Sequence, residues 1–313
     1  MIVAVIGHLC LDVIQHADGT ETQSYGGIYF SVATLANLLT DEDTIRPVFG
    51  VGKNDYDEFV EHLGRYPNID CSGIFKFAGF TNQVRLVYSS KEERIECSRF
   101  ISEPIPWKRI RPSVAHADLV LVNMISGMDI TLETLDELRM EVREDHVPVY
   151  LDVHSITLGI KPDFTRFYRP VEQWRRWLFM LHGAHLNEEE ASTLTAERLD
   201  EQTLAKHILA MNTKTLHVTR GKRGCTAYID DHKHIQRVDV AGIEPEKGID
   251  PTGCGDVFSA AYCAHYGKSK NIAAAVDFAN RVAARKAQLT GSTAIDELSS
   301  FRVQNSVLQK SSL

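Results

Sequence analysis

A glycine-rich segment in the last quarter of the chain carries the clearest chemistry in the sequence. Residues 248–256 read GIDPTGCGD and are followed at once by the small and apolar run VFSAAYCAHY. The proline and the glycines predict a tight turn, and the run after them predicts a helix. The backbone N–H groups of Gly253, Cys254 and Gly255 would then point at one spot at a helix N-terminus, where an anion is favoured.

Asp256 places a carboxylate in the middle of this predicted anion site. A carboxylate repels a phosphate, so it is a poor choice for phosphate binding alone. It is a sensible choice if Asp256 accepts the proton of an attacking hydroxyl while the amides stabilise a transferring phosphoryl group. The alternative is a first-turn acid that merely complements the helix dipole.

The segment resembles the C-terminal D-T-x-G-A-G-D signature of the ribokinase-like (PfkB-type) carbohydrate and nucleoside kinases. The matching residues are Asp250, Thr252, Gly253, Gly255 and Asp256, and Cys254 stands where the family usually has alanine or glycine. The resemblance implies that Asp256 is the catalytic base and that the amides of residues 253–255 form the anion hole. It also implies that main-chain oxygens near Asp250 and Thr252 could hold a monovalent cation such as K⁺.

Further motifs follow in the family's order along nearly the whole chain. Residues 7–12 resemble its first-strand G-x-x-x-x-D motif, residues 26–27 its di-glycine and residues 51–55 its V-G-x-D-type turn. Residues 187–190 match its N-x-x-E motif, and residues 218–224 match its T-x-G-x-x-G turn. Each motif is short, but the ordered set is specific.

These matches imply a role for each residue of the site. The substrate-binding residues would be Asp12, Gly26, Gly27 and Ser31. The nucleotide-binding residues would be Asn187, Thr219, Gly221 and Asn280, and Glu190 would hold Mg²⁺ through a bound water. Without the resemblance, Asp12 could be a turn residue at a strand end, and residues 187–190 would favour a strand end followed by an acidic first helical turn.

One departure from the family concerns the acceptor pocket. The family commonly has asparagine where this chain has Ser31, which reaches less far and makes fewer hydrogen bonds. Tyr25, Tyr29, Phe30 and Phe100 lie in or beside the segments expected to line the pocket. They favour an aromatic wall for the base of a nucleoside, unless Tyr29 and Phe30 instead pack into the core at the start of a helix.

Composition and charge exclude several classes of partner. The chain has 313 residues, 43% of them hydrophobic, and a formal charge of −8 with no basic run, so neither nucleic acid nor an anionic membrane surface is an expected partner. No apolar stretch approaches the length of a transmembrane helix, and residues 1–6 lack the basic flank of a signal peptide, which predicts a cytoplasmic protein. Six scattered cysteines predict reduced thiols.

The hydrophobic pattern predicts an α/β fold of the three-layer, ribokinase-like kind. Strand-like runs at 2–7, 47–52, 117–124, 147–153 and 215–221 alternate with amphipathic stretches at 31–39, 57–64, 132–144 and 199–211. This alternation predicts a mostly parallel sheet covered by helices on both faces.

The chain is expected to form one domain over residues 1–313. Insertions at about 12–25 and 73–102 read as β structure, the second as an antiparallel hairpin, and would form a small lid beside the site. An exposed lid edge needs a cover, which either closure over the substrate or the lid of a second subunit could supply, and a homodimer through the lid is expected.

The resulting hypothesis is a kinase that transfers the γ-phosphoryl group of ATP, with Mg²⁺, onto a primary hydroxyl of a sugar or nucleoside. The alternative is a catalytically idle relative that binds a nucleotide or sugar as a sensor. Such a relative should lose the base or the anion-hole glycines first, and this chain retains both.

Overall fold

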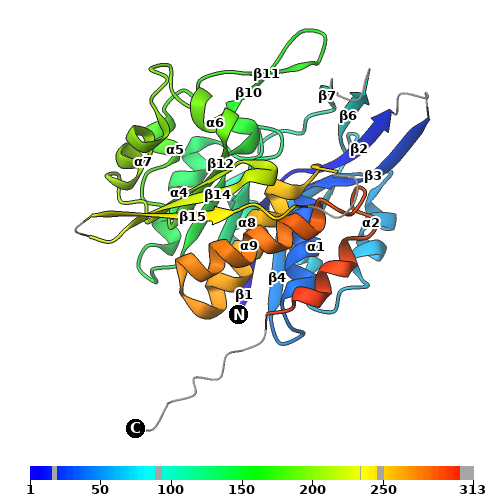
Figure 1. The fold of residues 1–313 in the computed structure, drawn as a ribbon. Coiled ribbons are helices and arrows are strands. Elements are labelled where there is room, and N and C mark those ends of the chain that lie inside the picture. The colour runs from blue at the N-terminus through cyan, green and yellow to red at the C-terminus, as the bar shows by residue number, and fades with distance from the viewer. Residues whose placement is uncertain (16–19, 89–93, 233, 245–249, 304–313) are drawn as a thin grey trace.

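A nine-stranded sheet forms the centre of the computed structural model, which describes residues 1–15, 20–88, 94–232, 234–244 and 250–303 (Figure 1). The strand order is β15-β14-β13-β12-β9-β8-β1-β4-β5. The strands are β1 (Ile2–Gly7), β4 (Thr44–Gly52), β5 (Ile74–Phe77), β8 (Leu119–Asn123), β9 (Val149–Asp152), β12 (Gly183–Asn187), β13 (Thr215–Thr219), β14 (Gly224–Asp230) and β15 (Ile235–Ala241). Neighbouring strands are parallel from β13 to β5, while β14 and β15 are antiparallel to their neighbours.

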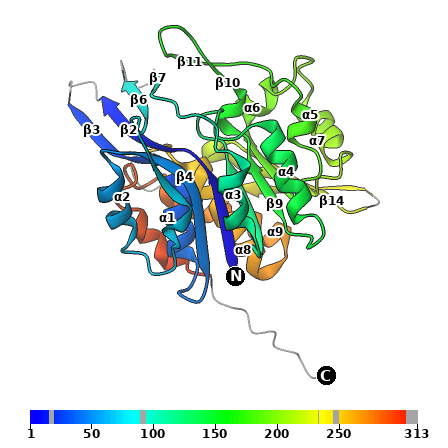
Figure 2. The ribbon, with the colours of Figure 1, turned by 180° about the vertical axis from the view of Figure 1, so that it is seen from behind.

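Helices cover both faces of this sheet (Figures 1 and 2). On one face lie α1 (Ile28–Leu38), α8 (Cys254–Ser269) and α9 (Ile272–Lys286), with α2 (Tyr56–Leu63) beside them; on the other lie α3 (Trp107–Val114), α4 (Leu132–Val142), α5 (Trp174–Trp177), α6 (Glu188–Thr193) and α7 (Glu201–Leu209). Every residue of α1 is buried, because it lies between the sheet, α8 and the 3-10 turn η4 (Ile295–Phe301). The predicted α/β architecture with a mostly parallel sheet is confirmed.

A second sheet of four strands projects from one end of the first (Figure 1). Its order is β3-β2-β6-β7, with β2 (Leu9–Gln15), β3 (Glu21–Gly27), β6 (Asn82–Tyr88) and β7 (Arg94–Arg99). β2 and β3 pair antiparallel, as do β6 and β7. A short hairpin of β10 (Leu158–Ile160) and β11 (Arg166–Tyr168) lies against β7, where Ser98 donates its N–H to the carbonyl of Phe164 at 3.0 Å.

The elements expected from the sequence compare closely with those observed. The five predicted strands and four predicted helices are present, with ends that differ by at most three residues. The segment 73–102 needs one correction, because its first part forms β5, which pairs with β4 in the main sheet and not with the hairpin. The predicted turn at residues 89–93 lies outside the described residues. No helix in the described part of the chain has the length and hydropathy needed to cross a bilayer.

Candidate active site

A cavity of about 800 Å³ lies where the carboxyl ends of the parallel strands meet the second sheet. Asp152, Asn187 and Thr219 end β9, β12 and β13, and all three line the cavity. This is the edge at which open α/β sheets bind their ligands. Its lining carboxylates are Asp12, Glu96, Asp152, Glu190, Asp250 and Asp256, and neither lysine nor arginine occurs among the described lining residues. An anionic donor therefore needs positive charge from histidine, from backbone amides or from a bound metal.

The glycine-rich loop forms the turn and helix start that the sequence predicts. Gly253 has a φ of +76° and precedes α8, whose sixteen residues begin at Cys254. A Cβ at Gly253 would stand 2.6 Å from the Phe30 ring, so only glycine fits. The Cys254 N–H donates to the carbonyl of Pro251 at 3.1 Å, whereas no acceptor is found among the described residues for the N–H groups of Gly253 and Gly255. The anion hole therefore has two open N–H groups where three were expected, because the Cys254 N–H already donates to Pro251.

Asp256 is held by a residue that the sequence analysis missed. Nδ2 of Asn123 donates to Oδ1 of Asp256 at 2.9 Å and to Oγ of Ser31 at 2.7 Å. Ser31 in turn donates to the backbone carbonyl of Asp256 at 3.3 Å. Ser31 is fully buried one layer behind the cavity, so its contacts position Asn123 and Asp256. The available signal was a polar residue at the end of the apolar run 117–124.

The electrostatic surroundings prepare Asp256 to take up a proton near neutral pH. Burial, helped by the neighbouring Asp152 carboxylate, raises the pKa of Asp256 to about 6 against the opposing influence of His154, Asn123 and His185. Burial alone would lower the pKa of His154, but the neighbouring carboxylate of Glu190, with smaller contributions from Asp256 and Asp152, raises it to about 10. His154 is therefore a cation in the cavity, and the sequence analysis did not single it out.

Asn187 and Glu190 form a capping box at the start of α6. Oδ1 of Asn187 accepts the N–H of Glu190, and Oε2 of Glu190 accepts the N–H of Asn187, both at 2.8 Å. The other oxygen of Glu190 lies 3.3 Å from Nδ1 of His154. Both residues also line the cavity, so a role in capping α6 is compatible with a role in binding a ligand.

The predicted acceptor-binding residues lie at the base of the second sheet. Asp12 is 5% exposed and lines the cavity, as does Gly27. Gly26 lies opposite the Asp12 carboxylate, and a Cβ there would stand 2.1 Å from its Oδ2. Sγ of Cys10 donates to Oδ1 of Asp12 at 3.3 Å. Asp12 and Gly27 can thus contact a ligand, whereas Gly26 leaves room for the carboxylate.

The expected aromatic wall is wrong for three of its four residues. Tyr29 is buried in the core, where its hydroxyl lies 2.8 Å from His62 and its ring packs against Tyr25. Neither tyrosine lines the cavity, because Tyr29 belongs to the first turn of α1 and faces α2. Phe100 is half exposed and does not line the cavity either, which leaves Phe30. The remaining apolar wall is aliphatic: Ile14, Val84, Leu86 and Ile125.

A smaller apolar pocket of about 140 Å³ adjoins the loop on the other side. Three of the four residues predicted on the nucleotide side line it, namely Thr219, Gly221 and Asn280, whereas Asn187 lines only the larger cavity. Asn280 donates to the carbonyl of Ala241 at 3.0 Å, which ties α9 to the end of β15. The rest of its wall comes mainly from Ile243, Phe258, Ala283, Ala284 and Ala287. A slot of this size and polarity suits a flat heterocycle.

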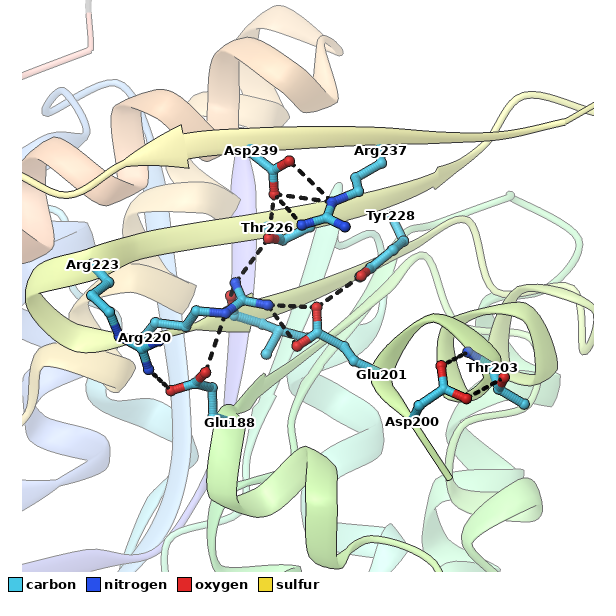
Figure 3. Close-up of polar contacts among 11 residues, drawn as sticks. Glu188, Asp200, Glu201, Thr203, Arg220, Arg223, Thr226, Tyr228, Arg237 and Asp239 are labelled. Carbon is cyan, nitrogen blue, oxygen red and sulfur yellow. Dashed lines mark hydrogen bonds and ion pairs between the residues drawn. The ribbon is translucent and has the colours of Figure 1, made fainter. Parts of the chain in front are cut away.

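An ionic network anchors the turn that follows Thr219 (Figure 3). The Arg220 guanidinium pairs with Glu201 at the start of α7 and with Glu188 of α6, and it donates to Oγ1 of Thr226 at 2.8 Å. The Arg220 side chain is only 16% exposed. These three contacts tie the turn to α6, α7 and β14, and Thr219 and Gly221 on either side of Arg220 line the smaller pocket.

The surroundings of Asp250 bear on the expected monovalent cation. Its carboxylate accepts the N–H groups of Thr252 at 2.9 Å and Gly291 at 2.7 Å. Burial would raise the pKa of Asp250, but those two N–H groups and the charge of Lys286 lower it. Lys286 is fully buried and donates to the carbonyl of Leu289 at 3.2 Å. The Thr252 hydroxyl is buried beside the Asp250 carboxylate, so oxygens that could bind a cation lie near the Lys286 ammonium.

The described residues contain no ready-made cage for a metal. Within them, no group of three or more histidine, cysteine, aspartate or glutamate side chains is placed to hold an ion. Mg²⁺ in kinases usually keeps several waters and uses one or two carboxylates with the substrate phosphates, so a cage is not required. Glu190 lines the cavity, and each carboxylate oxygen can accept more than one hydrogen bond, which is compatible with the expected contact through water.

Comparison with known proteins agrees with the motifs. Residues 2–298 match the pfkB family carbohydrate kinase. A cytidine kinase of Thermococcus kodakarensis is 23% identical over 279 residues, which cover 85% of this chain and 88% of that protein. A ribokinase of Bacillus subtilis is 31% identical over 172 residues, which cover 54% of this chain and 48% of that protein.

A solved structure shares the fold at low sequence identity. A pyrophosphate-dependent kinase in the ribokinase family superposes with a TM-score of 0.75 at 19% identity, covering 93% of this chain and 96% of that chain. The expected ribokinase-like fold is therefore confirmed. Since the family match extends over nearly the whole chain, this protein belongs to the pfkB family of carbohydrate kinases.

Proposed function

We propose that this protein transfers the γ-phosphoryl group of ATP onto a primary hydroxyl of a sugar or nucleoside, with Asp256 as the general base. The position of Asp256 carries the proposal: it stands at the start of α8, beside two unused amides and in the same cavity as Asp12. A pKa of about 6 suits a base that works at neutral pH. The Gly253 and Gly255 amides would stabilise the charge of the transferring group.

The choice of ATP over pyrophosphate rests on the smaller pocket. The kinase that shares the fold is pyrophosphate-dependent, and pyrophosphate has no nucleobase that a pocket could bury. Here an apolar slot beside the loop, with Asn280 and three alanines in its wall, offers a place for adenine. Thr219 lines both the slot and the large cavity, which would put the phosphates between the base and Asp256.

Two cations belong to the proposal. Mg²⁺, when bound, neutralises charge on the donor phosphates. Glu190 would hold one of its waters, Asn187 would contact the phosphates, and His154 would add a fixed positive charge beside them. Asp250 and Thr252 would provide oxygens for K⁺, with the Lys286 ammonium already nearby.

The acceptor would enter between the second sheet and Asp256. Asp12 would bind its hydroxyls, and the aliphatic wall would cover its apolar face. Three of the four aromatic residues that favoured a nucleoside do not line the cavity. The relatives include both a cytidine kinase and a ribokinase. Both acceptor classes therefore belong in the test. The second sheet would act as the lid. The β10–β11 hairpin lies against its outer strand β7, so pairing between two subunits would use the other outer strand, β3. Light scattering with and without acceptor would detect such a homodimer.

The deciding experiment is a coupled assay with the purified chain. ATP and pyrophosphate are each offered with pentoses, hexoses, myo-inositol and ribonucleosides, with Mg²⁺ present. The proposal predicts acceptor-dependent turnover with ATP at least tenfold above that with pyrophosphate. Binding of a nucleotide or sugar without turnover of any acceptor would instead support the idle sensor.

A further inference from the structure

A row of hydrogen-bonded polar side chains lines the cavity from β9 through β12 to β13. Asp152, His185 and Thr219 form the row, and Ser259 of α8 bridges the first two. Nδ1 of His185 lies 3.2 Å from the Asp152 carboxylate, and Nε2 lies 3.0 Å from Oγ1 of Thr219. Asp152, His185 and Ser259 are all 3% exposed or less. In such a row, the protonation state of one group determines whether its neighbour donates or accepts the hydrogen bond between them.

The hydrogen-bond inventory fixes the proton on Nδ1 of His185. Ser259 has one hydroxyl hydrogen and donates it to Oδ2 of Asp152 at 2.7 Å. Toward Nδ1, 3.2 Å away, the Ser259 oxygen can then only accept. The second neighbour of Nδ1 is a carboxylate oxygen, which also only accepts. Nδ1 must therefore carry a hydrogen.

The state of Nε2 then decides which way the Thr219 hydroxyl points. If His185 is neutral, Nε2 is an acceptor and the Thr219 hydroxyl donates its hydrogen to Nε2. If His185 is an imidazolium, Nε2 donates to Oγ1 and the Thr219 hydrogen is free to point into the cavity. Only the second state offers a hydrogen-bond donor to a phosphate oxygen.

The groups around the ring favour the imidazolium. Burial opposes the charge, but the carboxylates of Asp152, Glu190 and Asp256 together raise the pKa of His185 above its ordinary value. On the opposite side, burial and the charge of His185 lower the pKa of His217, which leaves that neighbour neutral. The His185 ring also stacks on Phe258 at 5.1 Å, which fixes its plane.

We propose that His185 is a positioning residue for the phosphoryl donor: it donates from Nε2 to Thr219, so that the Thr219 hydroxyl donates to a donor phosphate. The inference rests on the proposed function, in which Thr219 faces the donor. It assigns His185 a role in donor binding and none in acceptor binding, because the ring approaches the loop at Gly255 and not the second sheet.

Two amide substitutions separate the two ends of the ring. In His185→Gln the side-chain amide nitrogen can replace Nε2 and keep the bond to Thr219. In His185→Asn it can replace only Nδ1, so the bond to Asp152 is kept and Thr219 is released. Binding of a non-hydrolysable ATP analogue with Mg²⁺ is measured by calorimetry, and steady-state KM values are measured for donor and acceptor.

The proposal predicts a split between these variants. His185→Asn should bind the ATP analogue about ten- to a hundredfold more weakly than wild type, the usual consequence of losing a hydrogen bond to a charged group. His185→Gln should bind it at least about tenfold more tightly than His185→Asn. The KM for the acceptor should change by less than about threefold in both variants. Equal donor affinity in Asn and Gln variants would overturn the proposal.

Substitutions of Thr219 test the same bond without touching the buried ring. Thr219→Val should weaken donor binding about as much as His185→Asn, and the double variant should be no weaker than Thr219→Val alone. Thr219→Ser keeps a hydroxyl and should bind more tightly than Thr219→Val. If His185→Asn fails to fold, equal donor affinity in the Val and Ser variants still overturns the proposal. Wild type that binds no donor would sink the proposed function and this inference together; wild type that binds it while all variants behave alike sinks only the inference.

Discussion

Replacing Asn123 by leucine should shift the acidic limb of the pH profile without removing the catalytic base. Asn123 donates to Oδ1 of Asp256 at 2.9 Å and favours the ionised form of that carboxylate. Leucine has a similar volume and no hydrogen-bond donor, so the protonated form of Asp256 becomes more stable relative to the ionised form. A hydrogen bond to a charged group contributes roughly 1.5–3 kcal/mol, and one pKa unit corresponds to about 1.4 kcal/mol. The midpoint of the limb should therefore move from about 6 to between about 7 and 8.

The sign of the effect follows from the role of a base. Asp256 works when ionised, so activity rises with pH through its pKa. At pH 6 the ionised fraction should fall from about a half to between about a tenth and a hundredth, so kcat/KM falls roughly five- to fiftyfold. At pH 9 both proteins should be nearly fully ionised and their kcat/KM values should converge.

The assay is kcat/KM for the acceptor between pH 5 and pH 9 at saturating donor. Ser31→Ala is the matched control, because it removes the other acceptor of the Asn123 amide and leaves the bond to Asp256 in place. Its limb should move by less than about half a unit. An Asn123→Leu profile that drops equally at every pH would refute the reasoning, since it would indicate a role in geometry and not in the ionisation of Asp256.

Three further predictions concern other parts of the site. Gly26→Ala should raise the acceptor KM by about tenfold or more with unchanged donor binding, because the new methyl displaces the Asp12 carboxylate; equal loss of donor binding would contradict this. Arg220→Met should lower the free energy of unfolding by about 1–3 kcal/mol and raise the donor KM, as Glu201 loses its partner; denaturant unfolding and donor kinetics check it. Exchanging K⁺ for choline should lower kcat in wild type, because Asp250 and Thr252 would hold a monovalent cation; an unchanged kcat would contradict a cation site there.

Local signals in the sequence were enough for the scaffold and for the loop. The strand at residues 2–7 is a continuous apolar run, and the loop before α8 combines proline, glycine and aspartate in one short window. Both patterns depend on residues that are adjacent in the chain, so contacts between distant segments do not change the local structure that they predict. Gly253, with its positive φ, is an example.

The missed residues depend on contacts between distant segments. Asn123 meets Asp256 across 133 positions of sequence, and His154 meets Glu190 across 36. A polar residue near the end of an apolar run marks Asn123 only weakly, and no neighbouring motif marks His154. The prediction for Tyr29 failed for the opposite reason: it lies two residues after Gly27, but the turn into α1 directs its ring toward His62 and away from the cavity.

The most direct test of the central claim is the turnover of Asp256→Asn beside its donor affinity. Asparagine keeps the size of the side chain and the start of α8 but cannot accept the proton of the acceptor hydroxyl. The account predicts that kcat falls by about two to four orders of magnitude while the affinity for an ATP analogue stays within about threefold of wild type. An Asp256→Asn variant with near-normal turnover would contradict it.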